Sequence, residues 1–296
     1  MRLSTMASMF YRETSDLKNY VECIRRAHEV GFRVIDFNTS FFAKNKLDLF
    51  GDDWEARAAE IADEAVRLGV EFSQSHLPAP LPNIRNKDPY SERGEKSDFF
   101  RFCLERGIRV ASLLGVKWAV IHPVQNLITD EYNIDADIRY NHEIYDEFIE
   151  LADKLGVGIA FENMADIDGR RRFGTTPEEI IALIESYNSE QVKACWDFGH
   201  VNRCFTDRVR PLVQIGPYLR ATHVDDNIGR DDLHTIPFFG TIPWPEIMAA
   251  LKQINYSGDF NFELSCFRRI PETLLEHLGR YIYEVGTYLI ELYDKA

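Results

Sequence analysis

Six short segments of the sequence end in a side chain that can bind a metal ion. They are Gln74-Ser75-His76, Val120-Ile121-His122, Ala160-Phe161-Glu162, Cys195-Trp196-Asp197, Ala221-Thr222-His223 and Asn261-Phe262-Glu263. Taken singly, such a residue is as often a buried structural residue or a helix cap as a ligand. Three carboxylates and three imidazoles in one place are different, because their desolvation costs several kcal/mol unless a cation compensates it. If these segments meet, the sequence predicts a divalent metal ion between them.

Four of the six end residues form an oxygen-rich ligand set with a single imidazole. They are Glu162, Asp197, His223 and Glu263. Hard or borderline ions such as Mn²⁺, Mg²⁺, Co²⁺ and Zn²⁺ suit such a set, whereas ions that prefer thiolates do not. We therefore expect one divalent ion, and the ligand types leave the choice among these metals open.

The elements that must position these side chains recur at a regular interval. A helical stretch that ends near a glycine and is followed at once by a Val-, Ile- or Phe-rich run occurs at Gly31, Gly69, Gly115 and Gly156. Glycine at such a place is typical of a helix C-terminus. Eight strands are expected, at residues 2–6, 34–37, 71–75, 118–121, 158–161, 193–196, 220–222 and 259–262.

Amphipathic stretches that predict helices lie between these strands, at residues 16–30, 54–68, 98–114, 139–155, 177–187 and 245–254. Strands that alternate with helices pair in parallel, and eight right-handed crossovers close most naturally into a (β/α)₈ TIM barrel. An open, doubly wound sheet is the rival, but no Gly-x-Gly-x-x-Gly follows the first strand. We expect one domain over residues 1–296, an α/β barrel whose C-terminal strand ends bring the six segments together.

The composition argues against polyanionic partners. The chain has 34 Lys and Arg against 48 Asp and Glu, which gives a formal net charge of −14. Nucleic-acid-binding proteins neutralise phosphates with clustered Lys and Arg, so nucleic acid and anionic membranes are poor expected partners. The N-terminal residues hold no apolar stretch of signal-peptide length, and no run approaches the length of a membrane span. A cytoplasmic protein is therefore expected.

Seven ordered segments resemble a known protein family. They are Ser75-His76, His122-Pro123, Phe161-Glu162-Asn163, Asp197-Phe198-Gly199-His200, His223-Val224-Asp225-Asp226, Asp232-Leu233-His234 and Phe262-Glu263. The segments resemble those of the xylose isomerase-like TIM barrels (AP endonuclease family 2). That family includes sugar isomerases and epimerases, inosose dehydratase-like enzymes and the endonuclease IV type of abasic-site nuclease. The resemblance runs from the third expected strand to the eighth.

The resemblance implies two alternative ligand sets. In the sugar-active members, one divalent ion is held by the residues that Glu162, Asp197, His223 and Glu263 resemble. In the nucleases the set widens to three zinc ions, and five further residues look like that wider set: His76, His122, His200, Asp232 and His234. Sugar-active members often keep some of these extra residues as substrate contacts, and we favour substrate binding for these five.

The resemblance also implies proton-transfer chemistry on a metal-chelated keto-sugar or cyclitol, with Glu162 and Glu263 as the catalytic carboxylates. Return of the proton to the opposite face is epimerisation, return to the neighbouring carbon is isomerisation, and loss of a β-hydroxyl is dehydration by a lyase. An endonuclease IV-like phosphodiesterase is a further alternative, which the net charge opposes unless Arg170, Arg171 and Arg172 build a basic groove. A sugar-binding or subunit role without turnover, and a homo-oligomer, also stay open.

One segment departs from the family pattern. After Asp232-x-His234 the family commonly shows Pro-Gly-x-Gly, whereas this chain reads Pro237-Phe238-Phe239-Gly240. Phe238 takes the place of the first glycine, which puts the backbone route of the loop in question. The two phenylalanines are expected either to line the pocket or to plug the loop, and we favour the plug.

Overall fold

The computed structural model describes residues 1–11, 20–39, 48–78, 95–125, 132–166 and 171–296. Eight strands form one parallel sheet in the order β7-β6-β5-β4-β3-β2-β1-β8. The strands are β1 (Arg2–Met6), β2 (Val34–Asp36), β3 (Glu71–His76), β4 (Trp118–Ile121), β5 (Gly158–Glu162), β6 (Val192–Asp197), β7 (Leu219–His223) and β8 (Asp259–Phe262). All eight expected strands are present, and three of them have the expected bounds.

The sheet closes on itself between its first and last members. Backbone bonds join Val224 N to Asn261 O at 2.7 Å and Glu263 N to Val224 O at 3.1 Å. The Thr222 hydroxyl donates to Asp259 O at 2.8 Å in the same seam. These bonds bring the ends of β7 and β8 together, and the fold is the expected (β/α)₈ TIM barrel.

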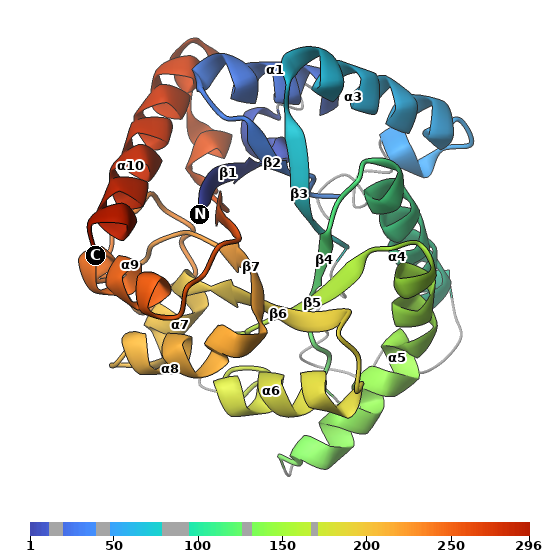
Figure 1. Ribbon diagram of the computed structural model, residues 1–296. Helices are drawn as coiled ribbons and strands as arrows, with labels where there is room; N and C mark the ends of the chain where they lie inside the picture. Colours follow the sequence, from blue (N-terminus) through green and yellow to red (C-terminus); the bar gives the residue numbers. More distant parts are fainter. Residues whose placement is uncertain (12–19, 40–47, 79–94, 126–131, 167–170) are drawn as a thin grey trace.

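The helices surround the strands, as Figure 1 shows in a view onto the N-terminal ends of the strands. They are α1 (Tyr20–Val30), α3 (Trp54–Leu68), α4 (Glu95–Leu113), α5 (Ile134–Lys154), α6 (Pro177–Ser186), α7 (Phe198–Cys204), α8 (Val209–Ile215), α9 (Trp244–Gln253) and α10 (Leu275–Lys295). Helices α7 and α8 were not expected, because seven residues are too few to show a helical period. Within the described residues, every helix is too short or too polar to span a lipid bilayer.

Local sequence signals explain where the helices begin and end. Thr176 caps α6 in a capping box with Glu179, and Pro177 takes the first helical position. Glycines 31, 69, 115 and 156 all adopt positive φ angles, as a helix-terminating glycine does. This confirms the helix ends that these glycines predicted, and a barrel strand begins two or three residues after each glycine.

The core lies in two layers. Apolar side chains between the helices and the outer face of the barrel form the larger cluster, which includes Trp196, Phe260 and Trp244. Inside the barrel, Val120, Ala160, Cys195 and Ala221 form a separate small cluster. Small side chains in this inner layer leave room above them for the longer polar side chains at the strand ends, where the candidate site lies.

Candidate metal centre

The six predicted ligand segments meet at one end of the barrel. His76, Glu162, Asp197 and His223 are the last residues of β3, β5, β6 and β7. His122 and Glu263 directly follow β4 and β8. Because the strands are parallel, all six side chains belong to the C-terminal rim, where TIM barrels assemble their active sites. The predicted convergence is confirmed.

Four of these side chains surround a single point. One ligand atom from each of Glu162, Asp197, His223 and Glu263 lies within 4.8 Å of the corresponding atoms of the other three. His223 Nδ1 is 3.1 Å from Glu162 Oε1 and 3.3 Å from Glu263 Oε2. Two ligands that bind one ion at about 2.1 Å stand about 3.0 to 3.4 Å apart at tetrahedral or octahedral angles. The distances therefore fit a shared metal ion.

Three of these four residues have buried polar atoms that lack a hydrogen-bond partner. Glu162, Asp197 and His223 are at most 1% exposed. Among the described residues, Glu162 Oε2, Asp197 Oδ2 and both ring nitrogens of His223 are buried without a hydrogen bond. Buried polar atoms are normally paired, because an unpaired one costs about 1–3 kcal/mol. A divalent cation would satisfy several of these atoms at once.

Backbone bonds orient Asp197 and its neighbours toward this point. Asn163 accepts from Asp197 N at 2.6 Å and donates to Asp197 O at 3.0 Å, which ties the end of β6 to β5. Asp197 Oδ1 accepts from His200 N at 2.6 Å and so caps α7. Oδ1 of Asp197 thus caps the helix, and Oδ2 remains available to a ligand.

His76 and His122 lie beside Glu162 on the neighbouring strands and form a second group with it. The Nδ1 of His76 contacts Leu77 O at 2.8 Å, which leaves Nε2 to face the site. His122 Nε2 is 3.0 Å and His76 Nε2 is 3.4 Å from the same oxygen, Glu162 Oε2. These two imidazoles are therefore placed to bind a second ion or a substrate oxygen.

His200, Asp232 and His234 form a third group on the other side of the site. His200 Nδ1 contacts Asn163 O at 2.8 Å, and His234 Nδ1 contacts Glu263 O at 3.1 Å. Their Nε2 atoms both face Asp232 Oδ2, at 3.4 and 3.3 Å. The five residues assigned to substrate binding thus lie on two sides of the four-residue centre.

Burial and neighbouring charges shift the pKa values of the groups in the centre. Burial raises the pKa of Asp197 to about 6. Burial also disfavours the charge on Glu162, but the imidazoles of His223 and His122 outweigh it and hold the pKa of Glu162 well below its ordinary value. For His200, burial is outweighed by Asp197 and Asp232, which raise its pKa to about 10. The carboxylates therefore draw positive charge into the site, as a ligand set for a cation does.

Two residues of the site were missed by the sequence reasoning. Asp225 is fully buried, and neither of its carboxylate oxygens has a hydrogen-bond partner among the described residues. It lies 3.9 Å from His234 Nδ1 and groups with Asp197 and His234. Its side chain packs on Gly199, where an added Cβ would stand 2.1 Å from Asp225 Oδ1. The sequence signal was present in the segment from His223 to Asp226, but neither aspartate was assigned a role.

The other missed residue is Asp36, at the end of β2. Its Oδ1 accepts from His76 N at 3.1 Å, and its Oδ2 accepts from Gln74 at 3.0 Å and Asn261 at 3.1 Å. The same Oδ2 lies 3.8 Å from His223 Nε2. Asp36 thus places a negative charge behind a ring whose other nitrogen faces the centre, at a distance longer than a hydrogen bond.

The loop after His234 corrects the expectation for Phe238 and Phe239. Both side chains are exposed, by 48% and 60%, and their rings lie near Tyr288 and Tyr281 of α10, so they neither line the pocket nor plug the loop. Phe238 nevertheless has a φ of 74°, the left-handed conformation that a glycine adopts without strain. The backbone of the loop thus keeps the conformation typical of glycine, although the residue is a phenylalanine.

Asp226 holds this loop in place. Its carboxylate accepts from Phe238 N at 3.0 Å and from the indole of Trp244 at 2.9 Å. It also accepts from Ile242 N at 3.2 Å and Asn227 N at 2.8 Å. Four donors on one buried carboxylate explain why the backbone follows its route despite the strained residue.

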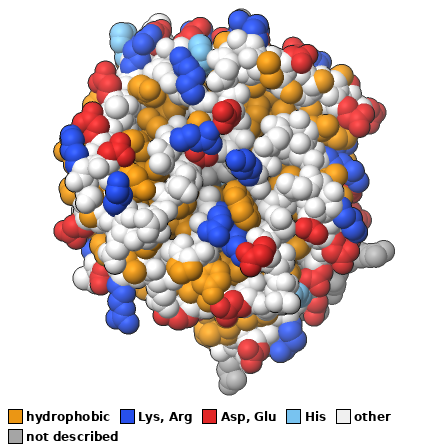
Figure 2. Space-filling model, viewed as in Figure 1, with side chains coloured by type: hydrophobic (Ala, Val, Ile, Leu, Met, Phe, Trp, Pro, Cys, Tyr) orange, Lys and Arg blue, Asp and Glu red, His pale blue; other side chains and the backbone are white. Residues whose placement is uncertain are grey.

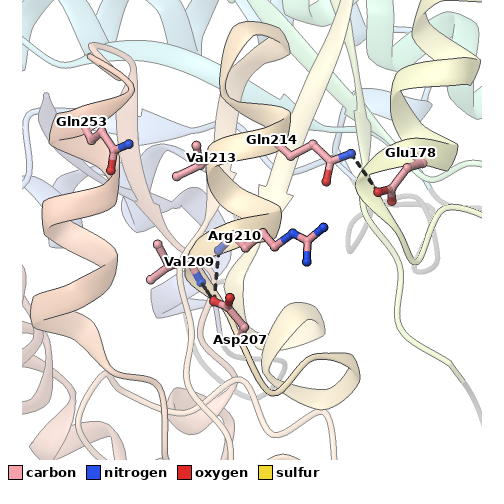
Figure 3. A pocket seen from close by; sticks show the side chains of 7 residues that line it. All are labelled: Glu178, Asp207, Val209, Arg210, Val213, Gln214 and Gln253. Carbon is pink, nitrogen blue, oxygen red and sulfur yellow. Dashed lines mark hydrogen bonds between the residues drawn. The ribbon is translucent and has the colours of Figure 1, made fainter.

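Away from the metal centre, a depression of about 610 Å³ lies on the outer surface between α6, α8 and the end of α9 (Figure 3). Gln214 donates to Glu178 there at 2.8 Å. Asp207 accepts from Val209 N and Arg210 N at 3.0 and 3.1 Å and so supports the start of α8. These carboxylates already have partners within the protein, and we assign no site to this depression.

The sequence of the chain matches a family model over residues 24–284, and that model is described as a xylose isomerase-like TIM barrel. The chain belongs to this family. The resemblance of the ordered segments around Glu162, Asp197, His223 and Glu263 is therefore confirmed at the level of the family.

Individual relatives are distant. The uncharacterized protein MJ1311 of Methanocaldococcus jannaschii is 28% identical over 60% of this chain, and the chain spans 61% of the length of that relative. A D-psicose 3-epimerase of Agrobacterium fabrum is 23% identical over 79% of this chain and 75% of its own. The crystal structure of the IolI protein with a bound zinc atom is similar in fold, with a TM-score of 0.73, 18% identity, and coverage of 100% of this chain and 99% of that one.

Proposed function

We propose that this protein is a divalent-metal-dependent sugar isomerase or epimerase that acts on a keto-sugar or a cyclitol. The observation that carries the proposal is the meeting of Glu162, Asp197, His223 and Glu263 around one point at the C-terminal rim. The similarity to D-psicose 3-epimerase supports a sugar substrate, and the zinc in IolI supports a metal. The donor set accepts Mn²⁺, Mg²⁺, Co²⁺ or Zn²⁺.

Glu162 and Glu263 are the proposed catalytic carboxylates as well as metal ligands. A bound divalent ion would polarise the substrate carbonyl as a Lewis acid and so acidify the adjacent C–H bond. Glu162 ends β5 and Glu263 follows β8, and one oxygen of each lies within 3.3 Å of the same His223 Nδ1, so carboxylates from two different strands reach a substrate held there. One carboxylate takes the proton from the α-carbon and the other returns it. Return to the opposite face of that carbon gives epimerisation, whereas a dehydratase or other lyase would expel a β-hydroxyl instead.

The flanking groups are proposed to hold the sugar hydroxyls. His76 and His122 lie on one side of Glu162, and His200 and His234 lie on the other with Asp232 between them. The Nδ1 atoms of His76, His200 and His234 are directed at backbone carbonyls, so their Nε2 atoms remain for a ligand. A polyol that lies across the centre would then meet hydrogen-bonding groups at both of its ends.

The test is proton exchange at the substrate α-carbon. Purified protein with its metal is incubated with a panel of keto-sugars and cyclitols in heavy water, and deuterium incorporation is measured by mass spectrometry. Glu162→Gln and Glu263→Gln should each lower exchange by about 10²- to 10⁴-fold. Glu284→Gln, a change of the same type on the exposed face of α10, serves as the control. Full exchange in either variant would remove that glutamate from the mechanism.

A second candidate is a metal-dependent phosphodiesterase of the endonuclease IV type. The observation that favours it is the presence of three neighbouring groups of ligand-type residues, two of which share Glu162, so the site offers ligands for three ions. The net charge of −14 opposes it, because a nucleic-acid substrate would be repelled. Cleavage of an abasic-site oligonucleotide with multiple turnovers, lost in His200→Asn, would favour this candidate over the epimerase. No cleavage together with deuterium exchange into a keto-sugar would exclude it.

A further inference from the structure

The opposite end of the barrel holds a cavity that is separate from the candidate metal centre. Its volume is about 430 Å³, and its lining includes Arg2, Ser73, Lys117, Arg220 and Asp259. All five lie at or near the N-terminal ends of strands. In Figure 2, which looks onto this end, Lys and Arg side chains gather around a central hollow.

The distance to the metal centre excludes a shared ligand. Arg220 lies near the start of β7, and His223 ends the same strand at the opposite rim. Three residues of extended chain separate them by about 10 Å, and the inner layer of Val120, Ala160 and Cys195 fills the barrel between. A molecule in this cavity would therefore be distinct from the substrate of the metal centre.

The charge of the cavity is positive, in contrast to the chain as a whole. Three cations line it against one carboxylate, Asp259. Arg2 donates to both oxygens of that carboxylate, at 2.8 and 3.1 Å, and also forms a salt bridge with Glu71. Within the described residues, Lys117 and Arg220 form no salt bridge with a carboxylate. Two positive charges thus line the cavity without a salt bridge to a carboxylate in the described part of the chain.

The Arg220 guanidinium is held in place rather than free in solution. Its Nη1 donates to Pro217 O at 3.2 Å and to Leu219 O at 2.7 Å. These two bonds fix one nitrogen of the planar group, and the donors on its other two nitrogens have no acceptor among the described residues. A guanidinium held in this way is suited to the two-pronged binding of a phosphoryl group.

An unpartnered hydroxyl points to a ligand independently of the charges. Ser73 lies on β3 and is only 8% exposed, yet its Oγ has no hydrogen-bond partner among the described residues. The same side chain lines the cavity. A buried hydroxyl that lacks a partner is costly, and an oxyanion in the cavity would supply the acceptor it lacks.

We propose that this cavity is a binding site for the phosphoryl group of a small molecule. Lys117, Arg220 and the Ser73 hydroxyl contact the phosphoryl oxygens, and the half-buried indole of Trp118 forms an apolar wall for the rest of the ligand. The volume lies within the range of small-molecule sites, about 300–1,000 Å³, and exceeds what a free phosphate ion needs. An organic phosphate therefore fits better than the free ion.

The proposal is tested by calorimetric titration of the metal-loaded protein with phenyl phosphate, inorganic phosphate and phenol at constant ionic strength. Phenyl phosphate should bind saturably, inorganic phosphate about tenfold more weakly at the same site, and phenol without measurable affinity. Equal affinity for phenyl phosphate and inorganic phosphate would identify the free anion as the ligand. In either case the phosphoryl group is what the site recognises.

Variants locate the binding. Lys117→Met with Arg220→Gln should lower the affinity for phenyl phosphate at least about tenfold, and Ser73→Ala, which keeps every charge, should lower it several-fold. Lys154→Met, which removes one exposed lysine of α5, should leave it unchanged. Circular dichroism checks that each variant is folded. The proposal is overturned by an absence of saturable binding, or by binding at full strength in the Lys117/Arg220 variant, which would place the phosphate at the metal centre.

Discussion

The two rims of the barrel are built from the same strands and carry opposite chemistry. On β7, Arg220 lies near the N-terminal rim and His223 ends the strand at the C-terminal rim. On β8, Asp259 begins the strand and pairs with Arg2, whereas Glu263 follows it and faces His223. The C-terminal rim gathers carboxylates and imidazoles suited to a cation, and the N-terminal rim gathers cations suited to an anion.

The two rims differ in burial, and burial decides how strongly a change at each rim should alter stability or metal binding. At the C-terminal rim Asp197 and His223 are fully buried, so their unpaired atoms are costly in the absence of a ligand. At the N-terminal rim the Arg2 side chain is 47% exposed, so its ion pairs are screened by water. We therefore expect changes at the C-terminal rim to have large effects, and changes at the N-terminal rim to have small ones.

The largest effect on stability is expected from removal of the metal. At a free ion concentration about a thousand times its Kd, binding stabilises the folded state by about 4 kcal/mol, which chelation would remove. Thermal unfolding with and without a chelator, followed by re-addition of Mn²⁺ or Zn²⁺, measures this contribution. The unfolding temperature of Asp197→Asn should respond much less to the chelator. An unfolding temperature that chelation leaves unchanged in the unmodified protein would contradict the large effect expected at the C-terminal rim.

Asp36→Asn should weaken metal binding without touching a ligand. An amide would place a donor where Asp36 now accepts from His76 N, Gln74 and Asn261, and it would remove the negative charge 3.8 Å from His223 Nε2. Loss of such a partner typically lowers metal affinity by about 10- to 100-fold. Competition with a fluorescent chelator measures the affinity, and the exposed Asp63→Asn is the control. Equal affinity in the two variants would contradict the positioning role of Asp36.

Arg2→Gln should have a smaller effect, and on stability alone. The change removes the ion pairs of Arg2 with Asp259 and Glu71 at a half-exposed position, which together contribute about 1 kcal/mol or less. Urea unfolding at low and high salt measures the loss, and the difference between variant and unmodified protein should shrink as salt rises. Metal content should stay the same. A loss of bound metal in Arg2→Gln would show that the rims are not independent.

The smallest effect is expected at Phe238, and two substitutions separate its causes. Phe238→Ala removes the ring but keeps a Cβ at a φ of 74°, whereas Phe238→Gly removes both. Relief of a left-handed residue is worth about 1–2 kcal/mol, and the greater freedom of unfolded glycine offsets about 0.4–1 of it. The glycine variant should be more stable than the alanine variant by about 0.5–1 kcal/mol in urea unfolding. Equal stability would mean that the loop relaxes around alanine.

Sequence patterns were sufficient for the barrel and for the six strand-end residues. The alternation of apolar strands with glycine-terminated helices indicates parallel pairing, and the polar residue after each strand then follows the strand to one rim. The same reasoning could not detect α7 and α8, whose seven residues each give no periodic signal. It also missed Asp36, because the expected strand at residues 34–37 placed this carboxylate inside the strand, whereas β2 ends at Asp36.

Phe238 shows a different limit. Its place in the loop could be aligned with a glycine from the sequence, but the direction of its ring depends on contacts with α10, about fifty residues further along the chain. The backbone route itself is imposed by the four donors that Asp226 accepts, three of which come from the loop and its following helix. Such long-range bonds leave no local pattern.

The sequence by itself determined the class of fold, the family, and which side chains stand at the ends of the strands, because periodicity and spacing are local properties of the chain. Only the tertiary structure decided which of these side chains share one point, which of their atoms lack partners, and where opposite charges collect on the two rims. Those properties depend on distances across the barrel and on exclusion of water, which arise when strands far apart in the chain close into one sheet.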